Sequence, residues 1–167
     1  MLRATTIVRK PAVKADKVAD SIVLDHEARH LRRSTFTAER GLQFLLDLQQ
    51  AAVLEDGDAV KLEDGRLVQV KAAPQRLVEI TTGDPARLLR LAWHIGNRHA
   101  AAEIGIDAIY IEDDHVLVEM VRGLGASTRI VERPFRPERG AYHHDAHARH
   151  GQDHSHDHGH HGHDHGS

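Results

Sequence analysis

The segment DPARLLRLAWHIGNRH, residues 84–99, carries the clearest helix signal in the chain. Asp84 can accept hydrogen bonds from the free backbone amides at the start of a helix, and Pro85 suits the first helical position. Gly96 and Asn97 both tolerate the left-handed backbone of a helix end. The apolar residues between them follow the three- and four-residue spacing of one helix face, namely Pro85, Leu88, Leu89, Ala92, Trp93 and Gly96. We therefore predict a helix with Trp93 buried on its inner face.

Strand patterns surround this helix. Residues 76–80 and 127–132 alternate as strands, and residues 102–112 form a weakly marked hairpin. Asp113 or Asp114 can cap a second helix, whose apolar face is expected to hold Val116, Leu117, Met120, Val121 and Leu124, with Gly125 as its stop. The resulting order β-α-β-β-α-β predicts a ferredoxin-like fold for this part of the chain.

The chain before this part reads as β structure. The turn signals at residues 54–58 and 63–66 alternate with short strand patterns, which is typical of a small β-barrel or sandwich. We therefore predict an α+β protein in three parts. Residues 1–74 form an all-β domain, residues 75–139 form the ferredoxin-like domain, and residues 140–167 form a disordered tail.

A basic run lies within the all-β part. Arg29, Arg32 and Arg33 are either a contact patch for an acidic partner or a solvated strand edge that charge keeps soluble. His26 and His30 read as ordinary strand residues.

Composition excludes several classes of function. The 167 residues suit one medium or two small domains, and a net charge of -3 without a basic stripe argues against nucleic acid as a partner. The absence of cysteine excludes disulfides and zinc–thiolate sites. The N-terminal residues lack a long apolar run, so we expect neither a signal peptide nor a membrane span, and a cytoplasmic location. We find no nucleophile beside a base and no phosphate-binding glycine loop, and expect no enzyme activity.

Histidine dominates the C-terminal end. Eleven histidines follow Gly140, namely His143, His144, His147, His150, His154, His156, His158, His160, His161, His163 and His165. Spaced His-x-His pairs put imidazoles within chelating reach, and neutral imidazole suits nickel, copper and zinc. Binding capacity should fall as the pH drops through about 6.5, the ordinary histidine pKa. A pH-sensing polyelectrolyte or a purification tag is the alternative, although engineered tags are usually unbroken runs.

Three further histidines are candidate ligands. His99 is either a buried core histidine or a ligand that a twofold dimer duplicates at its axis. His94 lies about 140° away from His99 around the same helix, so the two side chains cannot chelate one ion within one chain. His94 is therefore a separate candidate ligand. His115, beside Asp113 and Asp114, is a candidate for a peripheral site.

Several motifs in this order resemble the UreE family of urease accessory proteins. The resemblance rests on HIGNRH (94–99), DHVL (114–117) with Met120 and Leu124-Gly125, Pro134-Phe135, Pro137-Glu138, Gly140-Ala141-Tyr142, the LEDGD (54–58) and DGR (64–66) turns, and the histidine-rich end. It covers essentially the whole chain.

The resemblance implies a nickel metallochaperone. It implies an N-terminal domain that binds a protein partner, a dimerising C-terminal domain, and delivery of Ni(II) to apo-urease with the GTPase UreG and the other accessory proteins. It implies His99 as a metal ligand at the dimer interface, completed by His143 or His144. Some members have a peripheral His-x-His site, but here Asp113 replaces the first histidine. Zn(II) or Cu(II) binding is also expected. The alternatives are a nickel or zinc storage protein dominated by its tail and a peptide-binding co-chaperone.

Overall fold

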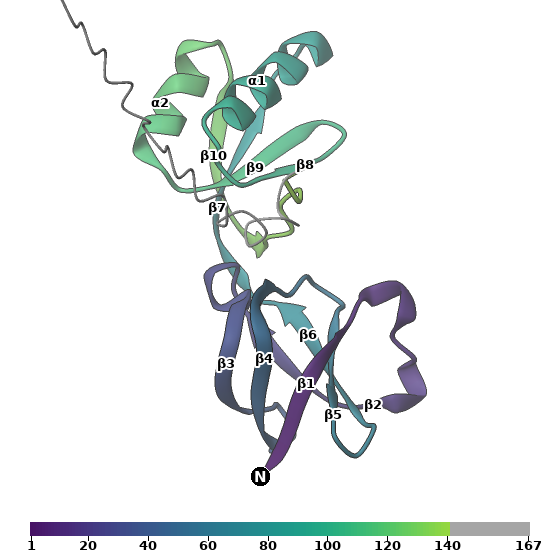
Figure 1. Ribbon diagram of the computed structural model, residues 1–167. Coiled ribbons are helices and arrows are strands. Elements are labelled where there is room, and N and C mark those ends of the chain that lie inside the picture. The colour runs from purple at the N-terminus through teal and green to yellow at the C-terminus, as the bar shows by residue number, and fades with distance from the viewer. Residues whose placement is uncertain (141–167) are drawn as a thin grey trace, which may run out of the picture.

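The computed structural model describes residues 1–140, whose strands form two separate sheets. Figure 1 shows the first sheet and the second sheet as two bodies, with β7 (Pro74–Thr81) leading from one into the other. No helix within residues 1–140 is long and apolar enough to cross a membrane. With two sheets and two α-helices, the chain is a mixed α+β protein of two domains.

The first sheet has six strands. They are β1 (Leu2–Val8), β2 (Val18–Leu24), β3 (His30–Thr37), β4 (Gln43–Val53), β5 (Ala59–Leu62) and β6 (Leu67–Ala72), in the spatial order β2-β6-β5-β1-β4-β3. Short 3-10 turns, η1 (Lys10–Ala12), η2 (Ala15–Lys17) and η3 (Glu27–Arg29), lie between the early strands. The predicted hairpin at residues 63–66 is confirmed, because β5 and β6 pair antiparallel around Gly65 at φ 88°. Two pairs, β1 with β4 and β2 with β6, are parallel, which the sequence did not indicate.

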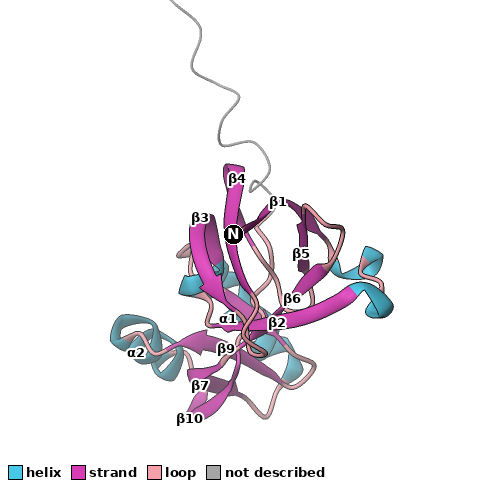
Figure 2. Cartoon of the chain, turned by 90° about the horizontal axis from the view of Figure 1, so that it is seen from below, coloured by secondary structure: helices cyan, strands magenta, loops and turns pink. Residues whose placement is uncertain are grey.

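This sheet curls around one apolar core. All six strands contribute side chains to it, with Phe44 and Leu46 of β4 fully buried at its centre. The edge strand β2 is joined to the β3–β4 turn by Asp20, whose carboxylate accepts hydrogen bonds from the backbone amides of Arg40 and Leu42. Burial opposes ionisation of Asp20, but these amide hydrogen bonds outweigh it and lower the pKa of Asp20. The buried Asp20 carboxylate thus links β2 to the β3–β4 turn, and Figure 2 shows the strands of this sheet from below.

The second sheet carries both helices on one face. Its elements run in the order β7, α1 (Pro85–Asn97), β8 (Ala102–Ile104), β9 (Ala108–Glu112), α2 (His115–Gly123) and β10 (Ser127–Pro134), and its strands lie in the order β10-β7-β9-β8. Val78 and Ile80 of β7 pack with Ile109 and Ile111 of β9 beneath the two helices. The opposite face is more polar, and there the Arg133 guanidinium lies 3.8 Å from the centre of the Tyr110 ring.

The first helix starts as predicted but buries a different face. The Asp84 side chain accepts a hydrogen bond from the Ala86 amide at 3.0 Å, and Pro85 occupies the first turn. The buried side chains are Leu91 and Ile95, with Leu88 and Ala92 partly buried beside them. The prediction that Trp93 is buried is wrong, because its side chain is 65% exposed, and Leu89 is 74% exposed.

The second helix shows the same kind of difference. Asp114 caps it by accepting a hydrogen bond from the Leu117 amide at 3.0 Å, and Gly125 follows its end at φ 90°. Leu117 and Val121 are buried as predicted, and Val118 joins them. Val116 is 61% exposed, so it does not belong to the inner face.

These helix faces give a stability prediction. Ile95→Ala should lower the free energy of unfolding by about 2–5 kcal/mol, because it leaves a cavity between α1 and the sheet. Arg90→Ala, at an exposed position of the same helix, should change it by less than about 0.5 kcal/mol. Urea denaturation followed by circular dichroism measures both. Equal midpoints for the two variants would contradict the assignment of the buried face.

Candidate metal site

His99 lies just past the end of α1 in an unusual backbone conformation. The Arg98 amide donates to the carbonyls of Gly96 and Ile95, and the His99 amide donates to the Gly96 carbonyl at 3.0 Å. His99 has φ 56° and is the one non-glycine residue with positive φ within residues 1–140. Its side chain is exposed, so it is not a core histidine. The left-handed residue that ends the helix is therefore His99, whereas the sequence suggested Gly96 or Asn97.

This conformation has a cost. Left-handed backbone costs an L-residue about 1–2 kcal/mol, and glycine adopts it without that penalty. Helix ends of this type usually place glycine at this position. An exposed histidine there contributes little packing, so the stability of the fold does not explain its presence. The position presents an imidazole to solvent on a backbone that a regular turn fixes.

The other two histidines of the second domain lie apart from His99. His94 is half-buried on α1, and its ring meets the edge of the Trp93 ring at a centroid distance of 5.0 Å. His115 begins α2 with its side chain 84% exposed, and its Nε2 lies 3.3 Å from Oε1 of Glu119, one turn along the helix. Asp113, which stands where a His-x-His pair needs its first histidine, forms an ion pair with Arg76 at 3.0 Å.

The described residues do not assemble a complete metal site within one chain. Within residues 1–140 there is no group of three or more His, Cys, Asp or Glu side chains placed to hold an ion. The eleven histidines that follow Gly140 lie outside the described residues. A site at His99 therefore needs ligands from the C-terminal tail, from a second copy of the chain, or from both.

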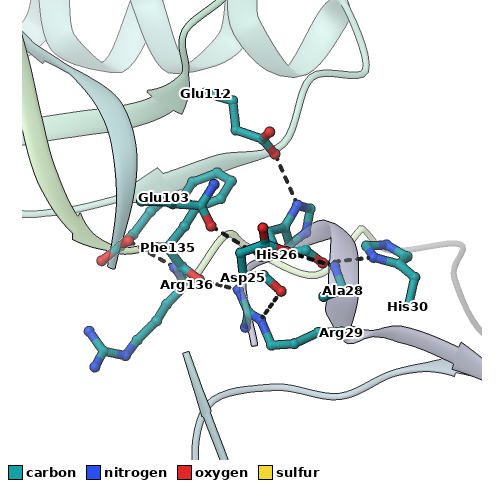
Figure 3. Close-up of polar contacts among 10 residues, drawn as sticks. Asp25, His26, Ala28, Arg29, His30, Glu103, Glu112, Phe135 and Arg136 are labelled. Carbon is teal, nitrogen blue, oxygen red and sulfur yellow. Dashed lines mark hydrogen bonds and ion pairs between the residues drawn. The ribbon is translucent and has the colours of Figure 1, made fainter. Parts of the chain in front are cut away.

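A pair of histidines, His26 and His30, lies where the two domains meet, as Figure 3 shows. His26 is not a strand residue as predicted; it precedes the η3 turn, and its Nδ1 lies 3.0 Å from Oε1 of Glu112 on β9. Its ring lies edge-on to the rings of Phe135, at 5.2 Å, and of His30, at 4.9 Å. Burial lowers the pKa of His26, and the Glu112 carboxylate opposes this effect. His26 is therefore a contact between the domains.

Sequence reasoning missed two features of this turn. Residues 26–30 read HEARH, which has the letters of the zinc-protease pattern HExxH. That chemistry needs both histidines on one face of a helix, whereas here the residues between them form a single 3-10 turn. Arg29 belongs neither to a surface contact patch nor to a solvated strand edge, the two predictions from the sequence, because its side chain is only 2% exposed. Arg32 and Arg33 are exposed.

The chain after β10 returns to this junction. Phe135 is fully buried, and its carbonyl accepts a hydrogen bond from Nη2 of Arg29. Arg136 then pairs with Asp56 at 2.7 Å, and the Glu138 amide donates to the Ala102 carbonyl at 2.8 Å. The last described residues before the tail are thus attached to both domains.

Comparison with known proteins agrees with this architecture. Residues 4–73 match the family model of the UreE urease accessory protein N-terminal domain, and residues 75–166 match that of its C-terminal domain. A urease accessory protein UreE of Azorhizobium caulinodans is 63% identical over 153 residues, covering 91% of this chain and 73% of the relative. Proteins of the same name from Bradyrhizobium and Chelativorans are 51% and 47% identical, over 89% and 90% of this chain and 70% and 94% of theirs.

The two domains and their order define a two-domain urease accessory protein. This chain belongs to the UreE family.

The His99 backbone gives a prediction that separates function from stability. With metal removed by a chelator, His99→Gly should leave the free energy of unfolding unchanged or raise it by up to about 1 kcal/mol, because glycine relieves the left-handed strain. Arg98→Gly should lower it by about 0.5–1 kcal/mol, because Arg98 has an ordinary φ of -92° and glycine gains only flexibility in the unfolded chain. Urea denaturation checks both. A clear loss of stability in His99→Gly would show that the imidazole packs structurally.

Proposed function

We propose that this protein is a nickel metallochaperone that binds Ni(II) and delivers it to apo-urease with the GTPase UreG and the other accessory proteins. It acts as a carrier and not as an enzyme, in the cytoplasm. The observation that carries the proposal is His99, an exposed imidazole that a left-handed helix end holds in place at an energetic cost. Such a ligand suits an ion that must be bound and later released, and imidazole nitrogen suits nickel.

A homodimer supplies the second copy of His99. The exposed apolar side chains of α1 and of the β8–β9 turn support it, since Leu89, Trp93 and Ile106 are 74%, 65% and 96% exposed. Leu89 and Ile106 also line an apolar groove of about 190 Å³, together with Pro85, Leu88, Ala92, Ile104, Gly105 and Ile109. Apolar surface of this kind marks a contact site. Because His99 follows α1 directly, a twofold contact through the C-terminal half of this helix, where Trp93 lies, would bring two imidazoles near one axis.

The start of the tail supports His143 and His144 as further ligands. The Glu138 amide donates to the carbonyl of Ala102, which follows His99 by three residues. Five residues of extended chain reach about 17 Å, so the first tail histidines can approach His99 from this attachment. The remaining tail histidines raise the capacity for nickel, and for Zn(II) or Cu(II), which imidazole also binds.

The domains divide this work. Residues 75–139 dimerise and hold the specific site; we infer that this domain is ferredoxin-like, since its strand order β10-β7-β9-β8 suits a split βαβ unit. Residues 1–74 meet a protein partner. His94 and His115 serve as accessory ligands, and Glu119 is placed to join His115. Storage of nickel or zinc by the tail is the second candidate, favoured by eleven of sixteen histidines lying after Gly140.

Nickel calorimetry on a chain that ends at Tyr142 tests the chaperone proposal. We expect one tight ion per two chains, because two His99 imidazoles form the core of the site. His99→Ala should abolish it, whereas His94→Ala, on the same helix, should retain it. Tight binding that persists in His99→Ala would refute the assignment. No tight binding without the tail would mean that the tail supplies essential ligands or that storage is the better description.

Dimer formation gives a separate prediction. Trp93→Asp should shift the protein from dimer to monomer in sedimentation velocity at micromolar concentration, because it places a charge in the apolar contact. Val116→Asp is the matched control, since Val116 is 61% exposed on the other helix. A Trp93→Asp protein that sediments as wild type would exclude this face as the interface.

A further inference from the structure

The segment that precedes the tail is bound more extensively than a linker needs. We call residues 135–139 the anchor segment. It follows β10 and touches the first domain at η3 and at the turn before β5, and the second domain at β8. We propose that this contact is functional: the N-terminal domain, through Arg29, Glu55 and Asp56, positions the metal-binding tail relative to His99. The inference rests on the proposed function.

Phe135 is the fixed point of the anchor segment. Its side chain is fully buried, and its carbonyl accepts a hydrogen bond from Nη2 of Arg29, while Nε of Arg29 donates to the Asp25 carbonyl at 3.2 Å. Burial lowers the pKa of Arg29, and the carboxylates of Asp56 and Asp25 oppose this effect. The guanidinium is therefore held in one orientation and fixes the start of the anchor segment against the first domain.

Arg136 joins the anchor segment to both domains at once. Its Nε lies 2.7 Å from Oδ2 of Asp56, and its backbone amide donates to Oε2 of Glu103 on β8 at 3.0 Å. The other Asp56 oxygen accepts a hydrogen bond from the Ala72 amide at 2.8 Å. Burial opposes ionisation of Asp56, but the hydrogen bonds from Ala72 and Arg136 outweigh it and lower its pKa. Asp56 is therefore charged at neutral pH and rigidly placed.

The last contacts set the point where the tail leaves. The Glu138 amide binds the Ala102 carbonyl at 2.8 Å, and Nε of Arg139 lies 3.2 Å from Oε1 of Glu55. His143 follows Arg139 by only four residues. The first domain thus determines where the short segment towards the first tail histidine begins.

The anchor segment thereby raises the effective concentration of the tail histidines near His99. With the anchor segment bound, His143 lies four residues after the last attached residue, Arg139; with residues 136–139 released, it lies eight residues after Phe135, which stays buried. Because effective concentration falls roughly as the −3/2 power of linker length, release should weaken the contribution of a tail ligand about threefold, or about tenfold when both tails of a dimer take part. The ion pairs themselves are partly exposed and contribute little to stability, so a purely structural role predicts no such change in metal affinity.

The first experiment measures the anchor segment without metal. The chain has no cysteine, so Gly140→Cys provides a unique position for a nitroxide label in the full-length protein. The spin-label spectrum should be that of an immobilised label, and Arg136→Gln or Glu55→Arg should make it mobile. The charge swap Glu55→Arg with Arg139→Glu should restore the immobilised spectrum. Arg129→Gln is the matched control, because Arg129 pairs with Glu79 at 2.8 Å away from the junction.

The second experiment titrates the same full-length variants, without the label, with nickel alone. We expect the tight site to weaken about three- to tenfold in Arg136→Gln and Glu55→Arg, to recover in the charge swap, and to match wild type in Arg129→Gln. Total nickel bound at saturation should not change, because no histidine is lost.

The two experiments distinguish the possible failures. A label that stays immobilised in both single variants overturns the anchor itself. A mobile label with unchanged nickel affinity shows that the anchor has no role in metal binding, provided that His99→Ala abolishes the tight site. If the tight nickel site survives His99→Ala, the proposed site at the dimer interface is wrong. An unchanged nickel affinity in the anchor variants then also overturns the proposal that the N-terminal domain positions the tail.

Discussion

The arrangement of the two domains depends on one buried guanidinium. Arg29 sits in the turn before β3 and binds the carbonyl of Phe135, which lies 106 residues further along the chain. A cation with almost no exposure is expensive to bury, and here carbonyl oxygens and nearby carboxylates offset that cost. Because the guanidinium donates from fixed positions in one plane, it also specifies orientation, which an apolar contact of the same area would not do. Around it lie the His26–Glu112 contact and the Arg136–Asp56 pair.

Local signals in the sequence were sufficient to locate the helices but not to orient them. Asp84 and Asp114 cap their helices as predicted, because capping depends only on residues within one turn. The inner face of α1 was misidentified because that helix carries two apolar stripes with the same spacing. Leu88, Leu91 and Ile95 lie on one stripe, and Leu89 and Trp93 lie on the other, roughly 150° around the helix. The spacing alone cannot tell which stripe meets the sheet. Only the position of the sheet decides this.

The candidate site shows the same limit. HIGNRH singled out His99 through a family resemblance, but not its backbone: Gly96 and Asn97 both tolerate a left-handed turn, whereas the turn forms at His99. The junction residues His26 and Arg29 carried no recognisable local signal, because their partners lie on β9 and after β10. The tail histidines were the most evident feature of the sequence, and their geometry lies outside the described residues.

The pairing of the first sheet orders the events of folding during synthesis. β1 is an interior strand whose neighbours are β4 and β5, so it is not paired along both edges until about sixty residues have been made. β2 likewise waits for β6. The first domain therefore folds as a unit after its final strand leaves the ribosome, and the second domain follows. Residues 135–139 emerge after every strand of both sheets, so the junction between the domains is the last part of the described chain to form, and the tail that follows is translated onto a nearly finished protein.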